Sequence, residues 1–430
     1  MKQRHLVVGL LGAVSALTFL DRMAISVTAP AIQKDLHIGP ALWGWVLSAY
    51  VLAYGLFEIP SGARGDRYGH RGEFTRITLW WSAFTAITGW CRGFWQLASA
   101  RFLFGIGAAG AYPNAAGVLW RWFPARERAR GQGVIWASSR LGGALAPLTL
   151  VPLQAAFGWR AVFWALAGLG LVWAIAWRAW YHDDPARQPG ITAQELAEIG
   201  PATHGGAHGS TPWGRLLRLP QLWLIFFAYL FYAWGSWFYY SWFPVWLVHA
   251  GRFSVAEMGI WASIPFILGI FSNLVGGWLC DALGSRIGLK SAYRWIAGGC
   301  LAVTAALLAA MSVAHSQLAV VVLASAGFAT MDLMLPSAWA MCMAIGGPFG
   351  GAATGVMNTA GQLGGLMCTV AFGYVVAATG NYELPVQAVA LMVLVSAGIF
   401  ALIDCTKGLV FEPVLEPVSA APAGDLEKVV

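Results

Sequence analysis

An apolar run extends from Leu6 to Ile32, and Asp21 and Arg22 are its only charged residues. A helix that crosses the hydrocarbon core of a bilayer needs about 20 predominantly apolar residues, so this run predicts a membrane-spanning helix. A charge near the bilayer centre costs at least roughly 2.5–3.5 kcal/mol. We therefore expect Asp21 and Arg22 to face protein or water. A binding or coupling site is the favoured interpretation, and a structural ion pair that joins two helices is the alternative.

Similar apolar runs recur along the whole chain. Hydrophobic residues make up 58% of the sequence and charged residues only 10%, which is typical of a polytopic membrane protein. We predict an all-α fold of twelve transmembrane helices. They are expected at residues 6–32, 41–63, 74–92, 95–119, 132–155, 160–181, 219–248, 256–280, 292–313, 316–344, 351–377 and 386–404.

The basic residues give these helices an orientation. Most of the 26 Lys and Arg lie in or beside alternate loops, beginning with the N-terminal flank of Lys2 and Arg4. Positive charge collects on the cytoplasmic side of membrane proteins, so both termini are predicted to be cytoplasmic, in a cell inner membrane. This placement also explains the net charge of +7 without a nucleic-acid partner. The first run is too long and too charged for a signal peptide, so we expect it to be retained.

A polar segment divides the spans six and six. It is rich in Pro, Gly, His and charge, and Thr192 to Glu195 within it have the pattern of a capping box that opens a short helix. His204 and His208 lie among glycines, where a flexible linker is favoured over a metal site. The predicted organisation is an N-terminal half at 1–181, a cytoplasmic linker at 182–218, a C-terminal half at 219–404 and a cytoplasmic tail at 405–430.

The two halves repeat one motif. Gly62, Asp66 and Gly69 close the second span, and Gly277, Asp281 and Gly284 close the eighth with the same spacing. Two similar six-helix halves, related by an axis along the membrane normal, are typical of transporters whose halves rock about a site between them. The predicted cytoplasmic gate consists of Gly62, Asp66, Arg67, Gly69, Arg71 and Asp281.

The loop from Gly62 to Arg71 resembles the cytoplasmic signature of the major facilitator superfamily, and the resemblance covers essentially the whole chain. It implies the twelve-helix major facilitator fold, with Asp66 at a helix terminus binding a nearby Arg and latching the halves. Within the superfamily the chain resembles the anion:cation symporter branch, especially its hexuronate and aldonate carriers. The matching residues are Asp21, Arg22, Tyr54, Arg101, Tyr112, Pro113, Asn114, Trp122, Phe123, Pro124, Glu127, Arg128, Trp339 and Asn358.

One position departs from that branch. The branch usually has a Glu that takes part in proton coupling five residues before the Pro of the fourth span, and this chain has Ala108 there. Coupling through that carboxylate is excluded, so either another acid serves or transport is uncoupled or differently coupled.

Three Arg residues lie inside the spans, and an organic anion needs a cation in a dry cavity. We predict that Arg22 and Arg140 bind the anion and that Arg101 is the partner of Asp21. The alternative is that all three form structural ion pairs. Only three acids lie clearly inside the spans. If each of them paired with one of the three Arg residues, no cation would remain for a substrate.

The same acids are the candidates for proton coupling, because a coupling carboxylate must change its charge as the cavity opens and closes. Asp21, with Arg101, is the first candidate. Glu58 either replaces the missing Glu or braces the gate, and Asp332 is a second coupling acid or, slightly favoured, a helix-packing residue. Polar and aromatic residues are predicted to complete the substrate site: Tyr54, Asn358, Gln362, Trp339, Tyr239 and Tyr240.

These features predict a secondary active transporter that imports a small carboxylate, such as a sugar acid, by proton symport with alternating access. An uncoupled facilitator or exchanger is the main alternative, followed by an exporter of hydrophobic drugs. No nucleophile–base constellation or metal-ligand spacing is present, so an enzyme is not expected, nor any cofactor beyond the coupling proton. The predicted partners are the substrate and the lipid bilayer, and the predicted assembly is a monomer.

Overall fold

The computed structural model describes residues 2–38, 40–200, 211–243, 246–247, 253 and 261–409, and every regular element in this part of the chain is a helix. Ten segments of it are long and apolar enough to cross a membrane, and one of these, Gln317–Val376, covers two helices. The long helices of the first half are α1 (Gln3–Val27), α3 (Pro40–Tyr68), α4 (His70–Trp90), α5 (Phe94–Ala108), α6 (Ala111–Trp122), α7 (Arg128–Phe157) and α8 (Trp159–Trp180). Those of the second half are α11 (Pro220–Trp237), α14 (Ile264–Ile287), α15 (Leu289–Val313), α16 (Gln317–Gly346), α17 (Gly350–Thr379) and α18 (Glu383–Leu402).

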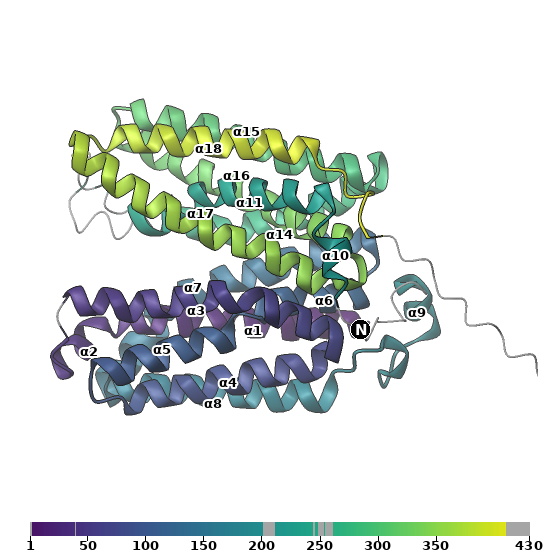
Figure 1. Ribbon diagram of the computed structural model, residues 1–430, viewed down its shortest axis with the longest axis horizontal. Coiled ribbons are helices and arrows are strands. Elements are labelled where there is room, and N and C mark those ends of the chain that lie inside the picture. Colours follow the sequence, from purple (N-terminus) through teal and green to yellow (C-terminus); the bar gives the residue numbers. More distant parts are fainter. Residues whose placement is uncertain are drawn as a thin grey trace, which may run out of the picture.

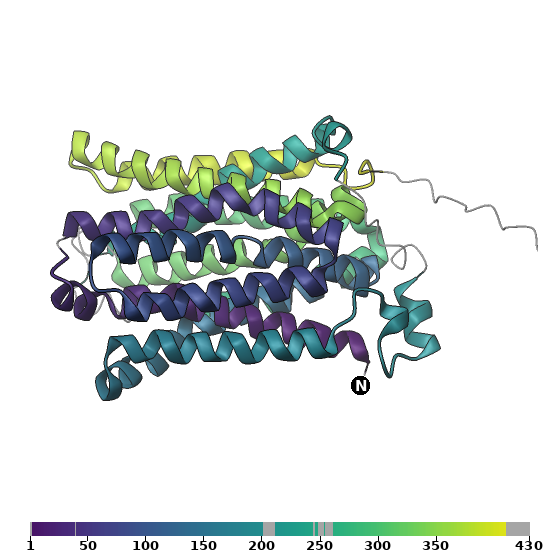
Figure 2. The same cartoon turned by 60° about the horizontal axis from the view of Figure 1, so that its bottom comes forward.

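The helices form two bundles that lie side by side. Figure 1 shows α1 to α8 in the lower bundle and α11 to α18 in the upper one, and the turned view of Figure 2 shows the same long, nearly parallel rods. Counting α5 and α6 as one span gives twelve, as predicted. The described parts of the linker, residues 182–200 and 211–218, lie at the end that also holds the N-terminus (Figure 1). This end carries the predicted cytoplasmic loops, including the turns at Gly69 and Gly288, and we refer to it as the basic end.

Two spans of the first half are divided within the described residues. The first ends at Val27, and a short helix, α2 (Ala29–Asp35), follows it with a proline in its first turn. The fourth breaks at Ala109 and Gly110 between α5 and α6. Pro113 explains this break, because it has no N–H to give to the carbonyl of Ala109 and its ring crowds that carbonyl.

The sharp turns at the basic end correct one detail of the predicted repeat. Gly69 separates α3 from α4 with φ +88°, a conformation that residues with a Cβ rarely adopt. Gly288 has φ +83° in the matching turn between α14 and α15, whereas Gly284 is buried inside α14. The structural counterpart of Gly69 is therefore Gly288, and α14 continues further beyond its aspartate than α3 does. The predicted start of the eighth span, at 256, lies outside the described residues.

The two halves touch closely at the basic end, where α3 packs on α17 and α7 on α14. A Cβ on Gly62 would lie 2.3 Å from the carbonyl oxygen of Gly351, and one on Gly277 would lie 2.7 Å from that of Ala129. Two related glycines thus allow two related helix crossings. The bundle is closed at this end because no side chain separates the backbones there.

The first part of the linker, residues 182–200, is docked on the first half. Its helix α9 (Ala193–Ile199) begins at Thr192, whose hydroxyl accepts the N–H of Glu195 at 3.1 Å, as the capping box predicts. The Glu195 carboxylate does not complete that box. It accepts the N–H groups of Gln3 and Arg4, at 3.0 and 2.9 Å, at the start of α1. His204 and His208 lie outside the described residues.

Candidate binding cavity

A cavity of about 580 Å³ lies between the two halves, and a smaller one of about 160 Å³ adjoins it through shared lining residues such as Arg22 and Gln362. Neither has an Asp or Glu among its described lining residues. The larger part, called the central cavity below, is walled by aromatic rings from both halves. These are Phe19, Tyr54, Tyr112, Trp136, Tyr229, Tyr232, Trp237, Tyr240 and Phe266.

Arg22 lines both parts of this space. Its guanidinium carbon lies 5.0 Å from the ring centroid of Phe19, 5.5 Å from that of Tyr50 and 5.4 Å from that of Tyr54. No carboxylate of the described residues comes within 4.0 Å of it, and its buried Nε has no hydrogen-bond partner. Aromatic faces attract a cation without neutralising its charge. Arg22 is therefore a cation in the cavity lining that makes no direct ion pair with a described residue.

Asp21 and Arg101 lie beside this cation, on the side of the first half. Both are buried, with 4% and 1% of their surface exposed, and Arg101 lines the smaller part of the cavity. Arg101 lies within range of the Asp21 carboxylate and its charge attracts it, but no nitrogen–oxygen distance between them is within 4.0 Å. Instead the Arg101 guanidinium stacks on Phe104, with its carbon 4.2 Å from the ring centroid. The predicted partnership is thus long-range rather than a direct ion pair.

Arg140 has a direct partner in the opposite half. Its Nε and Nη2 donate to the two carboxylate oxygens of Asp332 at 2.8 and 3.0 Å. The pair joins α7 to α16, and Asn273 of α14 adds a hydrogen bond of 3.0 Å to Asp332 Oδ2. Arg140 lines the central cavity, whereas Asp332 is fully buried behind it. The structure thus places a predicted anion-binding residue and a predicted coupling acid in one contact.

Glu58 makes a second contact between the halves. It is fully buried on α3, and its Oε1 accepts a hydrogen bond from the Asn358 side chain on α17. Its Oε2 has no hydrogen-bond partner. Tyr54, one turn earlier on α3, lines the central cavity together with Asn358. This carboxyl group makes no direct ion pair with a described residue, but it lies within range of the charge of Arg22, beside the cavity lining.

The other predicted substrate residues divide into two groups. Tyr54, Asn358, Gln362 and Tyr240 line the central cavity. Trp339 does not: its side chain is fully buried, its Nε1 donates to the Tyr229 hydroxyl at 3.1 Å, and its ring packs behind the aromatic wall.

Tyr239 is also buried outside the cavity, where its hydroxyl donates to the carbonyl of Ala324 at 2.8 Å. Both predictions are corrected for the same reason, since each ring fills a core position and its polar atom is already satisfied by protein. No cluster of His, Cys, Asp or Glu in the described part of the chain is suited to a metal ion.

At the basic end, the predicted gate aspartates bind helix N-termini across the interface. Asp66 accepts the N–H groups of Gly351 and Ala352 in the first turn of α17, at 3.2 and 2.7 Å. Asp281 accepts the N–H of Arg130 in the first turn of α7 at 2.9 Å, and its Oδ2 lies 3.8 Å from Arg130 Nε. Carboxylates at these positions complement the partial positive charge of a helix N-terminus.

The predicted Arg partner of Asp66 is not in contact with it. Arg67 is exposed and lies over the ring of Tyr68, and Arg71 donates to the carbonyl of Arg178 at 3.0 and 2.7 Å. The remaining gate residues act through the backbone, because Gly62 allows the helix crossing and Gly69 forms the turn.

Comparison with known proteins fits this architecture. The family model of the major facilitator superfamily matches residues 11–369. The chain belongs to the major facilitator superfamily. It is 32% identical to the probable sulfoacetate transporter SauU of Cupriavidus necator over 90% of each chain. It is 27% identical to the hexuronate transporter of Bacillus subtilis over 85% of this chain and 86% of that one.

The fold has solved relatives as well. The structure of the superfamily transporter FucP in the outward conformation matches with a TM-score of 0.73 at 13% identity, over 92% of this chain and 98% of that one. That structure shares the fold of this chain. As a member of the major facilitator superfamily the protein is a transporter and not an enzyme.

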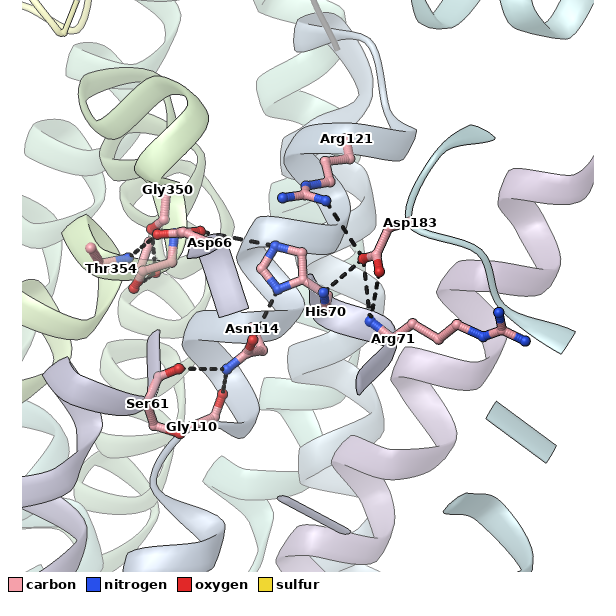
Figure 3. A network of polar contacts seen from close by, with 12 residues as sticks. Ser61, Asp66, His70, Arg71, Gly110, Asn114, Arg121, Asp183, Gly350 and Thr354 are labelled. Atoms are coloured by element: carbon pink, nitrogen blue, oxygen red, sulfur yellow. Dashed lines mark hydrogen bonds and ion pairs between the residues drawn. The ribbon is translucent and has the colours of Figure 1, made fainter. Parts of the chain in front are cut away.

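A histidine lies within the network of polar contacts around Asp66, which Figure 3 shows. The imidazole of His70 lies between Asp66 and Asn114, with Nε2 3.9 Å from Asp66 Oδ1 and Nδ1 2.9 Å from Asn114 Oδ1. The Asn114 amide nitrogen donates to the carbonyls of Ser61 and Gly110, so its oxygen faces the ring and Nδ1 is the donor. Sequence reasoning missed His70, although it stands inside the signature loop between Gly69 and Arg71.

Sequence reasoning also missed three other positions at the cavity and at the basic end. Trp136 lies one helical turn before Arg140 and lines the same cavity, a relationship that helical spacing predicts. Asn273 is a polar residue in the apolar run of α14 and holds Asp332. Asp183, which follows α8, accepts the N–H of His70 at 2.7 Å and lies 3.6 Å from Arg121 Nη1. No local signal in the linker marks that carboxylate.

Proposed function

We propose that this transporter imports a small organic anion, a sugar acid such as a hexuronate or an aldonate, together with a proton, and that its halves rock to give alternating access. The observation that carries the proposal is Arg22, a cation in the central cavity with no carboxylate of the described residues within 4.0 Å. A carboxylate that enters the cavity supplies the missing counter-ion through two parallel hydrogen bonds.

The cavity suits such a solute in size and chemistry. Its volume of about 580 Å³ falls within the range of small-molecule sites. Tyr54, Asn358 and Gln362 offer hydroxyl and amide groups to sugar hydroxyls, and the aromatic wall offers faces to the apolar side of a sugar ring. The relatives named for hexuronate and sulfoacetate transport support an acidic substrate. A hydrophobic drug would leave Arg22 uncompensated.

Three buried acids can carry the coupled proton. Asp332 and Glu58 each contact the opposite half, so their surroundings change when the halves separate. Asp21 is attracted by Arg101 inside the first half. Proton binding to Asp21 or Glu58 removes a buried charge that makes no direct ion pair with a described residue, and proton binding to Asp332 weakens its contact with Arg140 in the other half. Either event gives the proton a means of changing the balance between conformations.

Uncoupled exchange is the second candidate, because Ala108 occupies the position where the resembled branch has its coupling Glu. Ala108 is buried at the end of α5, with 1% of its surface exposed.

The distribution of Lys and Arg supports an orientation in an inner membrane. In this orientation the basic end of the protein lies in the cytoplasm.

Transport in proteoliposomes tests both candidates. Purified protein is reconstituted, and uptake of labelled D-galacturonate, D-gluconate and sulfoacetate is measured with and without an inward proton gradient. Symport predicts accumulation that an uncoupler abolishes, whereas exchange predicts uptake that depends only on anion trapped inside.

The matched variants are Arg22→Ala and Arg178→Ala, of which the second removes an exposed Arg at the end of α8. Loss of a charged hydrogen-bond donor is expected to weaken binding by roughly tenfold to a hundredfold in Arg22→Ala only. Uptake in Arg22→Ala that equals the wild type would refute the site.

A further inference from the structure

The ion pair between Arg140 and Asp332 has the geometry with which an Arg binds the carboxylate of a substrate. One edge of the guanidinium, Nε and Nη2, donates to both oxygens of one carboxylate. The pair lies at the margin of the central cavity, because Arg140 lines the cavity and Asp332 is fully buried beyond it. The two side chains come from different halves of the protein.

The Asp332 carboxylate is held from its own half as well. Asn273 donates to Oδ2 at 3.0 Å, and a Cβ on Gly269 would lie only 2.5 Å from the same oxygen. The carboxylate thus occupies a slot on α14 that exists because residue 269 is a glycine. It keeps one hydrogen-bond donor, Asn273, if Arg140 leaves.

Arg22 and Arg140 share one aromatic neighbour. Their guanidinium carbons lie 5.0 and 5.9 Å from the ring centroid of Phe19, so they are no further apart than the sum of these two distances. Both line the central cavity, which has no acidic residue among its described lining. With Asp332 bound to Arg140, the cavity presents one uncompensated cation. With Asp332 displaced, it presents two cations a short distance apart.

We propose that Asp332 binds Arg140 at the position that the second acidic group of a substrate would take. The state of this pair then determines whether the cavity accepts one anionic group or two. This inference rests on the proposed function, because it assumes that Arg22 binds the first acidic group. A solute with one acidic group binds Arg22 and leaves the internal pair intact. A short solute with two acidic groups reaches Arg140 only by displacing Asp332.

The displaced carboxylate keeps the hydrogen bond from Asn273 to its Oδ2. The displacement also breaks an ion pair between the two halves, so it links occupancy of the second position to their separation.

The test compares two matched pairs of solutes. Sulfoacetate carries a sulfonate and a carboxylate, and isethionate has the same two-carbon skeleton with a CH2OH group in place of the carboxylate. Galactarate and D-galacturonate form the longer pair. Affinities are measured by calorimetry on the full-length protein in detergent, and the readout is the ratio of dianion to monoanion affinity within each pair.

Asp332→Asn keeps the shape of the side chain and removes its charge. We expect this variant to raise the sulfoacetate-to-isethionate ratio by about tenfold or more, since Arg140 becomes free to bind the second acidic group. The galactarate-to-galacturonate ratio should rise less, because an extended six-carbon diacid is too long for two neighbouring cations.

A second variant controls for the loss of the ion pair itself. In the double variant Arg140→Gln with Asp332→Asn two amides replace the ion pair, and we expect no rise in the sulfoacetate-to-isethionate ratio over that of the wild type. An unchanged ratio in Asp332→Asn, in protein whose melting temperature matches that of the double variant, overturns the inference and leaves Arg140–Asp332 as a structural pair. Failure of the wild type to bind any of the four anions would instead overturn the proposed function.

Discussion

Asp66, at the end of α3 in the first half, binds the N–H groups of Gly351 and Ala352 at the start of α17 in the second half. Asp281 makes the related contact with Arg130 at the start of α7. The duplicated motif thus provides two similar contacts between a carboxylate and a helix N-terminus, one on each side of the interface. Both close the basic end of the bundle while the central cavity remains between the halves.

Asp66→Asn is expected to open the basic end more often. An amide has one acceptor oxygen and no charge, and the loss of a charged cap costs about 0.5–2 kcal/mol. Distances between spin labels placed at Arg126 and Ser285, which are exposed in opposite halves at this end, should shift towards longer values. The shift should be larger when Asp281→Asn is added.

The control for this experiment is Asp184→Asn. Asp184 caps Ala186 within the linker and makes no described contact with the second half. If the label distances of Asp66→Asn and Asp184→Asn both equal those of the wild type, the aspartate contact does not hold the basic end closed.

Gly62→Ala is expected to lower the melting temperature. The new Cβ would lie 2.3 Å from the carbonyl oxygen of Gly351, so α3 and α17 would have to move apart. Gly9→Ala in α1 is the matched control, because no atom lies within 4 Å of the position of its Cβ. Alanine is favoured over glycine in a helix by up to about 1 kcal/mol, so the control should be as stable as the wild type or more so. Equal melting temperatures would show that the crossing tolerates a methyl group.

The docking of the linker on α1 should depend on pH. The hydrogen bond from Lys2, together with the charge of Arg4, holds the pKa of Glu198 below its ordinary value. A carboxyl group with a lowered pKa stabilises the docked state fully above its ordinary value of about 4.3, and this contribution is lost as the pH falls through the lowered value. A spin label at Gln194, exposed on α9, should therefore become more mobile below about pH 4.

Glu198→Gln provides the comparison for that experiment. We expect the label to be more mobile at neutral pH in this variant and its mobility to change less with acid. The same acid response in Glu198→Gln as in the wild type would assign the effect to another group.

Asp21→Asn is expected to separate exchange from accumulation. Asp21 is buried and does not line the central cavity, so substrate should still bind and exchange across the membrane. Proton-driven accumulation in proteoliposomes should be lost if Asp21 carries the proton. Accumulation at the wild-type level would assign coupling to Glu58 or Asp332.

Much of the fold follows from the sequence. Apolar runs of bilayer length predict the helices, because an isolated backbone in lipid must satisfy its own hydrogen bonds. The repeated Gly and Asp spacing predicts two related halves, and Asp66 and Asp281 do lie at related helix ends. The break in the fourth span was not predicted, although Pro113 gives a local reason for it. The turn equivalent to Gly69 was assigned to Gly284 rather than Gly288, because spacing alone does not show where a helix ends.

The site was only partly predictable, because cavity lining depends on how each helix is rotated. Arg22, Tyr54, Asn358 and Gln362 were predicted to face the cavity and do so. Trp339 was also predicted there and is buried behind the lining rings. An aromatic residue in a membrane helix fits lipid, core or cavity equally well, and nothing in its neighbours along the chain distinguishes these places.

The sequence by itself determined that charged residues lie within membrane helices, since the lengths of the apolar runs and the positions of Asp21, Arg22, Arg101 and Arg140 are properties of the chain. Only the tertiary structure decided which of these cations is free. Arg140 binds Asp332, a residue 192 positions away, while Arg22 has aromatic rings around it and no described acid within 4.0 Å. Ion pairing depends on distances of a few ångströms between helices, and these are set by the packing of two halves that local sequence does not encode.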